Sequence, residues 1–273
     1  MREDVIAAAV EEVTTVVLES LRRGDTPTPE ALRLLLRGYA ATGRDELRDV
    51  LEPALAHALE LAVDSSSTAA PGWLLLFAEA ADASEDARLR AAASDLASKA
   101  RMNWGGTQPI DISAASVDAY LRALPMLADG SAQLAVDELE RLVADAYEPG
   151  DGIAGGIDHE IHLSAALLTA FAVTERLPYA MLAEELLRHA RPRLLTLHTA
   201  LSFSTTCDAA SALSRMAALH HAAEYRTAAV IAPGADYAGD AADMLERVAR
   251  VAYSHGLAGA AYALAAGELQ SAF

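Results

Sequence analysis

The feature of this sequence that most constrains its fold is a repeated pair of helical segments. Apolar residues recur at helical spacing along almost all of the 273 residues, with short breaks between segments. We expect the first members of the pairs at residues 3–22, 45–63, 85–101, 131–147, 178–195 and 236–253. The second members are expected to begin near residues 28, 71, 112, 158, 205 and 255. Steps of about 40 to 50 residues between pairs are typical of helical-repeat folds.

The composition favours helices over sheets. Hydrophobic residues make up 53% of the chain and are mostly alanine and leucine, whereas aromatic residues make up only 5%. Alanine and leucine are strong helix formers, and strands prefer β-branched and aromatic residues. Thr28 followed by Pro29 is a typical helix start, and Ser84 is expected to cap the next first member. No strand-turn-strand pattern is found. We therefore predict one all-α domain covering residues 1–273.

Six helix pairs can be arranged in two ways. An open solenoid stacks them in a superhelix, and a closed (α/α)6 toroid or barrel brings the last pair back to the first. The second members are the more apolar, as in "HLSAALLTAFAV" and "GLAGAAYALAAGEL". The first members carry more charge, as in "DELERLVADAY". A buried inner ring and an amphipathic outer ring are what a closed toroid needs, so the toroid is our prediction.

Charge and cysteine content limit the function classes. A net charge of −18 argues against nucleic acid and anionic membranes as partners. Cys207 is the only cysteine, which excludes an internal disulfide and cysteine-based zinc or iron–sulfur sites, and Lys99 is the only lysine, which argues against Schiff-base chemistry. The N-terminus does not resemble a signal peptide, and no apolar run is long enough to span a bilayer. We expect a cytoplasmic protein without a cofactor.

The chain before each inner helix is the place to look for a site. In a toroid the inner helices run the same way, so their N-terminal ends and positive dipole ends gather at one mouth. Three such entries read "NWGGTQPIDIS" (103–113), "DGIAGGIDHEIHLS" (151–164) and "HTALSFSTTCDAAS" (198–211). The first two share a Gly-Gly pair, at 105–106 and 155–156. Glycine here can form a turn or let the backbone approach a ligand, and both uses stay open.

These entries supply the candidate site residues. The candidate catalytic acids and bases are Asp111, Asp158, His162 and Asp208. Asp158 and His162 are four residues apart and so share one helix face, and pairs of carboxylates or histidines can do acid/base work. The alternative for Asp111 and Asp158 is helix capping, and for the histidines it is hydrogen bonding within the ring. The candidate substrate-binding residues are Trp73, Trp104, Gly155, Gly156, His159, Thr205, Cys207 and His255.

Three further chemical interpretations each have a structural alternative. His255 or His220 can partner His162, although His220 lies near a helix C-terminus, where the dipole favours a cation. Cys207 at a helix start can be a nucleophile or a buried inert thiol. An acid and a histidine stand four apart twice, as Asp158 with His162 and as Glu185 with His189. Because the first pair is expected on an inner helix and the second on an outer one, no metal site is predicted.

Part of the chain resembles a known group of toroids. "GGIDHEIHLSAALLTAFAVTERLPYAMLAEELL" and "CDAASALSRMAALHHAAEYRTAAVIAPGADYAGDAADMLERVA" resemble the α/α-toroid half of thioredoxin-domain-containing YyaL-type proteins. These proteins are distantly similar to N-acylglucosamine 2-epimerases and six-hairpin glycosidases. The match is most visible over 150–265, and the thioredoxin-like domain and its CxxC are absent.

The resemblance implies a toroid with a small-molecule ligand in its central cavity. Such a protein would be an isomerase or cyclase, or hydrolase-like, acting on a sugar-like or apolar metabolite. The chain has only two tryptophans and four phenylalanines, which is few for a cavity that stacks sugars. The alternative is a non-catalytic helical-repeat module that binds a ligand or a protein.

Overall fold

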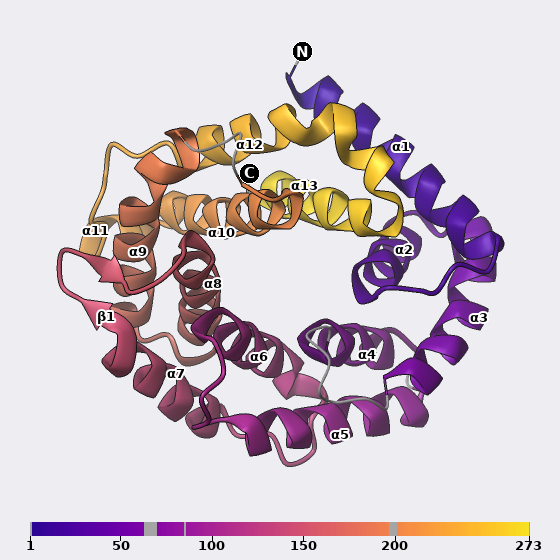
Figure 1. The fold of residues 1–273 in the computed structure, drawn as a ribbon, viewed down its shortest axis with the longest axis horizontal. Coiled ribbons are helices and arrows are strands. Elements are labelled where there is room, and N and C mark those ends of the chain that lie inside the picture. The colour runs from indigo at the N-terminus through magenta and orange to yellow at the C-terminus, as the bar shows by residue number, and fades with distance from the viewer. Residues whose placement is uncertain (1, 63–69, 85, 197–200, 273) are drawn as a thin grey trace.

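The computed structural model describes residues 2–62, 70–84, 86–196 and 201–272, and it confirms the all-α prediction. Within these residues the helices form two concentric rings (Figure 1). The inner ring consists of α2 (Pro29–Thr42), α4 (Ala70–Ser84), α6 (Ile110–Ala123), α8 (Ile157–Thr174), α10 (Phe203–His221) and α13 (Ala260–Ser271). The outer ring consists of α1 (Arg2–Arg22), α3 (Asp45–Leu61), α5 (Ala87–Asn103), α7 (Ala132–Ala146), α9 (Leu177–Thr196) and α12 (Tyr237–Ala252).

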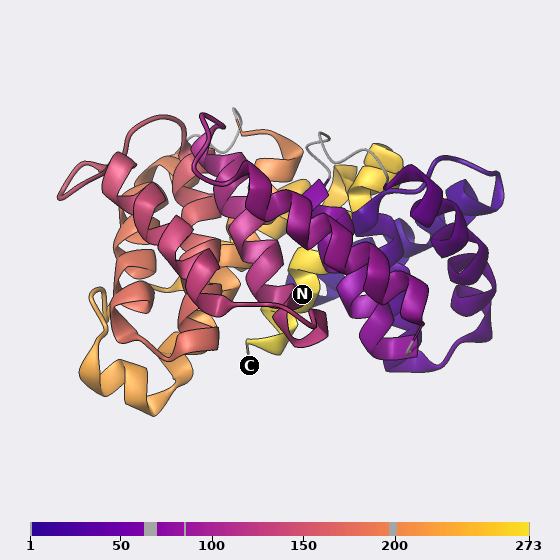
Figure 2. The same ribbon diagram turned by 90° about the horizontal axis from the view of Figure 1, so that it is seen from below.

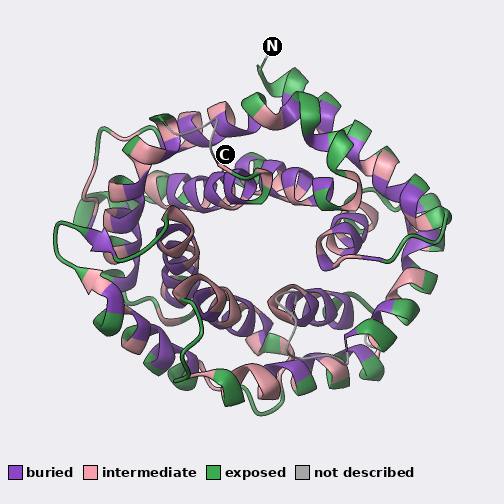
Figure 3. Cartoon of the chain, viewed as in Figure 1, coloured by how far each residue is buried: buried purple, intermediate pink, exposed green. Residues whose placement is uncertain are grey.

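Contacts between the first and last helices close both rings. Each inner helix packs against the next, and α13 packs against α2; on the outside, α1 packs against α12. One continuous hydrophobic cluster runs through all the pairs. Exposed residues gather on the outward surfaces of the outer helices, while buried residues dominate the inner ring (Figure 3). This is the burial pattern that apolar second members and amphipathic first members require.

The inner helices all start on the same side of the molecule. Seen from the side, the connections that lead into α6 and α8 lie along one face, and the C-terminal end of α13 lies at the opposite face (Figure 2). The positive ends of the inner helix dipoles therefore share one face, which we call the entrance face. Among the described residues, no helix is both long and apolar enough to cross a membrane.

Helix ends follow local hydrogen bonding, and one predicted cap is wrong. Thr28 caps α2 as expected, its side chain accepting a hydrogen bond from the Ala31 N–H at 3.3 Å. Ser84 does not cap α5. It is the last residue of α4, where its hydroxyl bonds back to the Ala80 carbonyl at 2.7 Å. Asp86 caps α5 instead, accepting from the Arg88 N–H at 2.8 Å, because a carboxylate is a strong acceptor for the free N–H groups of a helix start.

The structure adds short elements that the periodicity did not reveal. They are η1 (Leu124–Met126), α11 (Ala223–Ala228), η2 (Tyr253–Gly259) and an antiparallel pair of two-residue strands, β1 (Tyr147–Glu148) and β2 (Gly152–Ile153). Two residues are too few to show an alternating pattern. The last inner helix begins at residue 260 rather than near 255, because Gly256, with φ 58° and ψ −130°, interrupts the helical path.

Candidate functional site

The centre of the candidate site is a histidine–carboxylate pair between α8 and α10. His162 Nε2 lies 3.8 Å from Asp208 Oδ2, and the two side chains are 28% and 45% exposed. Burial raises the pKa of the Asp208 carboxyl; His162 opposes this rise, and the carboxylates of Glu30 and Asp158 add to it. Asp208 is thus closely surrounded by protein and other charges while solvent still reaches it. A carboxyl in that position keeps its proton to higher pH than usual.

Asp158 joins this pair through the first turn of α10. Its Oδ1 accepts a hydrogen bond from the Thr205 hydroxyl at 2.7 Å. The Thr205 oxygen in turn lies 2.7 Å from the Ser202 hydroxyl, whose oxygen also accepts from the Thr205 N–H at 3.0 Å. Because the Thr205 proton goes to the carboxylate, Ser202 is the donor to Thr205. Four predicted residues, Asp158, His162, Thr205 and Asp208, therefore meet at the starts of α8 and α10.

A second histidine–carboxylate pair joins α6 to α8. His159 Nε2 lies 3.5 Å from Asp111 Oδ1. His159 Nδ1 is 3.1 Å from the Ala154 carbonyl oxygen, so this nitrogen carries a proton and donates it. Asp111 Oδ1 is buried and has no hydrogen-bond partner among the described residues. The carboxylate oxygen and the free imidazole nitrogen face one another across a gap slightly longer than a hydrogen bond.

The capping alternative for the two aspartates is wrong. The N-cap residues of α6 and α8 are Pro109 and Gly156, and neither makes a side-chain cap hydrogen bond. Asp111 and Asp158 lie two residues after these N-caps, in the first turn, where the dipole stabilises a carboxylate while its oxygens stay directed at other helices. Neither aspartate is therefore an N-cap residue.

The glycine pairs form turns, and one glycine is also needed for close approach. Gly155 has φ 117°, and a Cβ built there would lie 2.2 Å from His159 Nδ1. Gly156 has an ordinary φ of −85° and no such neighbour. Gly105 has φ 74°, and its N–H is bonded to the Glu138 carboxylate at 3.2 Å. The close approach predicted for a ligand is therefore made by a histidine ring of the protein itself.

The two predicted tryptophans pack into the protein. Trp73 is 7% exposed and stacks on Phe77, with ring centroids 5.9 Å apart. Trp104 donates its Nε1–H to the Ser116 hydroxyl at 3.3 Å and meets the Tyr120 ring edge-on at 5.1 Å. These contacts use the ring faces and the polar end of Trp104 for packing.

Cys207 and His255 also lie outside the polar group. Cys207 is 1% exposed, and burial raises the pKa of its thiol far above the usual range, with Asp208 adding to the rise. A buried thiol of this kind is a poor nucleophile. His255 lies in η2 and stacks on Phe203 with centroids 3.9 Å apart. His220 turns outward to Glu184, to which its Nε2 donates at 2.9 Å, rather than toward His162.

The histidine of α9 belongs to a structural clamp, whereas Glu185 accepts a hydrogen bond from the Tyr147 hydroxyl at 2.7 Å. His189 contacts Glu160, not Asp158, with Nδ1 2.6 Å from Glu160 Oε1, and Arg193 binds the other oxygen of this fully buried carboxylate. Gly152 of β2 packs so closely here that a Cβ would lie 2.4 Å from His189 Nδ1. In the described part of the chain, no three His, Cys, Asp or Glu side chains are arranged to hold a metal ion.

Sequence reasoning missed Glu30 and a set of charges inside the ring. Glu30 lies in the first turn of α2, and its charge reaches Asp208. Deeper in the ring every inner helix except α8 contributes a charged side chain to two neighbouring sets of ion pairs, whose charges also act on one another; together we call them the interior charged cluster. Its members are Arg33, Arg37, Glu79, Asp118, Arg122, Arg215 and Glu268. The sequence carries a signal for this cluster, since each of its charged residues interrupts an otherwise apolar inner helix.

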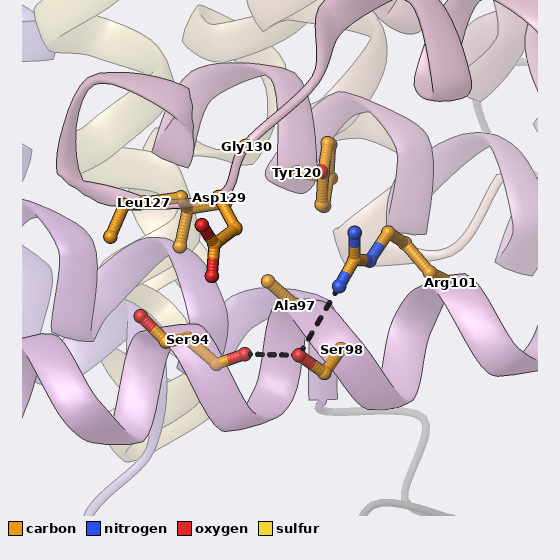
Figure 4. Close-up of a pocket in the computed structure, with 9 residues that line it drawn as sticks. Ser94, Ala97, Ser98, Arg101, Tyr120, Leu127, Asp129 and Gly130 are labelled. Atoms are coloured by element: carbon orange, nitrogen blue, oxygen red, sulfur yellow. Dashed lines mark hydrogen bonds between the residues drawn. The ribbon is translucent and has the colours of Figure 1, made fainter.

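Two cavities lie away from the entrance face. One, of about 80 Å³, lies between α5 and residues 127–130; there Arg101 donates to the Ser98 hydroxyl at 3.4 Å, and Ser98 donates to the Ser94 carbonyl at 2.9 Å (Figure 4). The other, of about 720 Å³, lies between the starts of α1 and α12 and the end of α13. Neither is lined by Asp158, His162 or Asp208.

No protein-family model matches this chain, and comparison with curated proteins and with solved structures finds no match either. The resemblance to YyaL-type toroids therefore stays a prediction. The side chains at the starts of α8 and α10 are the strongest indication of what the molecule does.

Proposed function

We propose that this chain is a small-molecule enzyme built on an (α/α)6 toroid, working by acid/base chemistry at the entrance face. The observation that carries the proposal is the convergence of Asp158, His162 and Asp208 from two neighbouring inner helices. Proton transfer needs an acid and a base within reach of one substrate, each with a pKa suited to its task. His162 and Asp208 lie 3.8 Å apart, which puts an acid and a base within reach of one substrate. The raised pKa of Asp208 suits the role of the acid.

The three side chains divide the chemistry. Asp208, which holds its proton to higher pH, is the acid that donates to a leaving or carbonyl oxygen. His162, partly exposed beside it, is the base that removes a proton from the substrate. Asp158, fixed by Thr205, stays in place as a carboxylate that stabilises positive charge. This set serves an isomerase or cyclase, or a hydrolase-like enzyme, acting on a sugar-like or apolar metabolite.

A substrate panel followed by NMR in D₂O tests the proposal. The panel contains aldoses, N-acylhexosamines, p-nitrophenyl glycosides and prenyl-type alcohols, so that carbon-bound deuterium, bond cleavage and ring formation are all visible. We expect one class to turn over, and Asp208→Asn and His162→Gln each to slow it by about 100-fold or more. Asp95→Asn, an exposed aspartate on α5, is the matched control and should leave turnover unchanged.

Turnover that survives both site variants would contradict the proposed roles. Binding of a panel member without any turnover would instead favour the non-catalytic binding module.

A further inference from the structure

Inside the ring, two arginines share one carboxylate. Asp118 Oδ2 lies 3.1 Å from Arg122 Nε, and Asp118 Oδ1 lies 3.6 Å from Arg215 Nη1. Asp118 and Arg122 are on α6, whereas Arg215 is on α10, so the contact spans α8 and crosses the interior of the ring. The three side chains are 17%, 23% and 16% exposed, so solvent reaches them at this depth.

Arg215 uses two of its five donors on α8, and Arg122 uses fewer of its own. Arg215 donates to the Ala165 carbonyl at 3.1 Å and to the Thr169 hydroxyl at 2.6 Å, and Thr169 donates to Asp118. The terminal nitrogens of Arg122 donate no hydrogen bond to any described residue. A guanidinium carries five donors; the terminal nitrogens of Arg122 are not buried, so their donors are open to solvent, and the charges of Glu268 and Glu79 act on Arg122 together with that of Asp118.

Positive charge is in excess in this interior. The interior charged cluster holds four arginines against three carboxylates, Glu79, Asp118 and Glu268. Glu79 is already held by Arg33 and Arg37, each at 2.9 Å. Burial lowers the pKa of Arg215 to about 10, with the like charge of Arg122 adding to the effect, so both remain cationic at neutral pH and repel one another.

The arginine pair lies directly below the candidate site. Arg215 follows Asp208 by seven residues on α10, and Thr169 follows His162 by seven residues on α8. Seven residues are close to two full helical turns, so the two residues of each pair lie on the same face of their helix, about 10 Å apart along its axis. The contacts His162–Asp208 and Thr169–Arg215 are therefore the same cross-helix contact repeated two turns deeper.

We propose that Arg122 and Arg215 form an oxyanion subsite that binds the carboxylate or phosphate of the substrate. An oxyanion there would take up the free donors of Arg122 and screen the repulsion between the two guanidiniums. Arginine suits this role because its planar fork matches carboxylate and phosphate geometry. The spacing selects ligands whose reacting atom is about 10 Å from the anionic group. This inference rests on the proposed function for the identity of the reacting end only.

Calorimetric titration with inorganic phosphate, and separately with acetate, tests the subsite. Ionic strength is held constant with chloride. We expect the wild-type protein to bind one of the two anions with a Kd of about 1 mM, the range of simple anion sites, and the tighter anion identifies the group that the substrate carries. Binding of neither anion would overturn the inference.

Variants locate the binding. Arg122→Gln should weaken it by at least about tenfold, because hydrogen bonds to charged groups are lost. Arg48→Gln, on the exposed surface of α3, is the control and should bind as the wild type does. Equal affinity in Arg122→Gln would overturn the inference.

A measurement on the unaltered chain covers the case in which the variants misfold. Phenylglyoxal modifies accessible arginines, and peptide mass spectrometry reports the rate at each site. The bound anion should slow modification of Arg122 and Arg215 several-fold while Arg48 and Arg88 react as before. Unchanged rates at Arg122 and Arg215 would overturn the inference.

The two proposals fail separately. Asp208→Asn should abolish turnover yet bind the anion as the wild type does. Anion binding without any turnover would support the oxyanion subsite and contradict the proposed enzymatic function. Turnover without anion binding would support the enzymatic function and contradict the subsite.

Discussion

At the scale of single residues, Asp208 combines two properties that seldom occur together. Its carboxyl is crowded enough for burial to raise its pKa, yet 45% of the side chain is exposed. A buried structural carboxylate looks different. Glu184 is fully buried and accepts hydrogen bonds from two backbone N–H groups, Tyr225 and His220. The contrast separates a carboxyl that solvent reaches from one whose oxygens are all taken up by the protein.

The charges around Asp208 predict pKa changes of opposite sign. His162 opposes the rise, so His162→Gln should raise the Asp208 pKa further, whereas Glu30→Gln should lower it by removing a like charge. Carbon-detected NMR of labelled aspartate side chains against pH measures both. Shifts of the same sign in the two variants would contradict this account of the electrostatics.

At Gly155 the backbone and a neighbouring ring leave no room for a side chain. Gly155→Ala places a methyl group 2.2 Å from His159 Nδ1 at a φ of 117°, and we expect it to cost about 1–3 kcal/mol and displace the ring from Asp111. Gly156→Ala, one residue on, has space and an ordinary φ; it loses only the N-cap preference for glycine and should cost less, about 0.5 kcal/mol. Urea unfolding and the His159 ring resonances report the two effects, and equal costs would refute the close-approach explanation.

At the scale of elements, helix pairing could be read from periodicity, and the irregular connections could not. All six expected pairs are present, because apolar residues at helical spacing report burial directly. The strands around Gly150 and the turns of η2 arise from positive-φ glycines and tertiary contacts instead. The meeting of Asp158, His162 and Asp208 followed from their place at inner-helix starts. The pairing of Arg122 with Arg215 did not, since it depends on which helix faces cross the ring.

The segment between α10 and α12 depends on one buried carboxylate. Glu184 on α9 accepts from the N–H groups of Ile231 and Ala232 at 2.8 and 2.9 Å. Glu184→Gln puts an amide donor against these donors, and we expect a loss of about 3 kcal/mol in the free energy of unfolding. Glu12→Gln, on the exposed face of α1, is the control. Chemical denaturation measures both.

This effect should depend on pH in a definite direction. Burial alone would raise the Glu184 pKa, but the two backbone N–H groups, Tyr225 and His220 outweigh it and the pKa is lowered. A lowered pKa means stability that is present above the unfolded value, near 4.5, and is lost as pH falls through the folded value. The difference between wild type and Glu184→Gln should therefore be largest at neutral pH and shrink in acid. A stability difference that grows in acid would contradict the lowered pKa of Glu184.

At the scale of the whole molecule, closure decides how the chain unfolds. An open solenoid has two free ends, where terminal repeats contact one neighbour and fray first. Here α13 packs against α2, α10 and α12, and α1 packs against α12 and α13, so the terminal helices have neighbours on both sides. The ion pairs of Arg2 with Asp243 and Glu246 at this junction are exposed and contribute little. Closure therefore rests on buried residues of the single core cluster.

Native-state hydrogen exchange distinguishes closure from end-to-end stacking. In a closed ring, opening at any pair breaks the shared core, so the slowest amides of α1 and α13 should exchange with the same free energy as those of α6 and α8, close to that of global unfolding. In an open stack, α1 and α13 would exchange well before the central helices. Adding a destabilising Val13→Ala substitution in α1, which is fully buried, sharpens the test. In a ring it lowers protection in α6 and α8 by the same amount as in α1, because no pair can be lost without opening the rest.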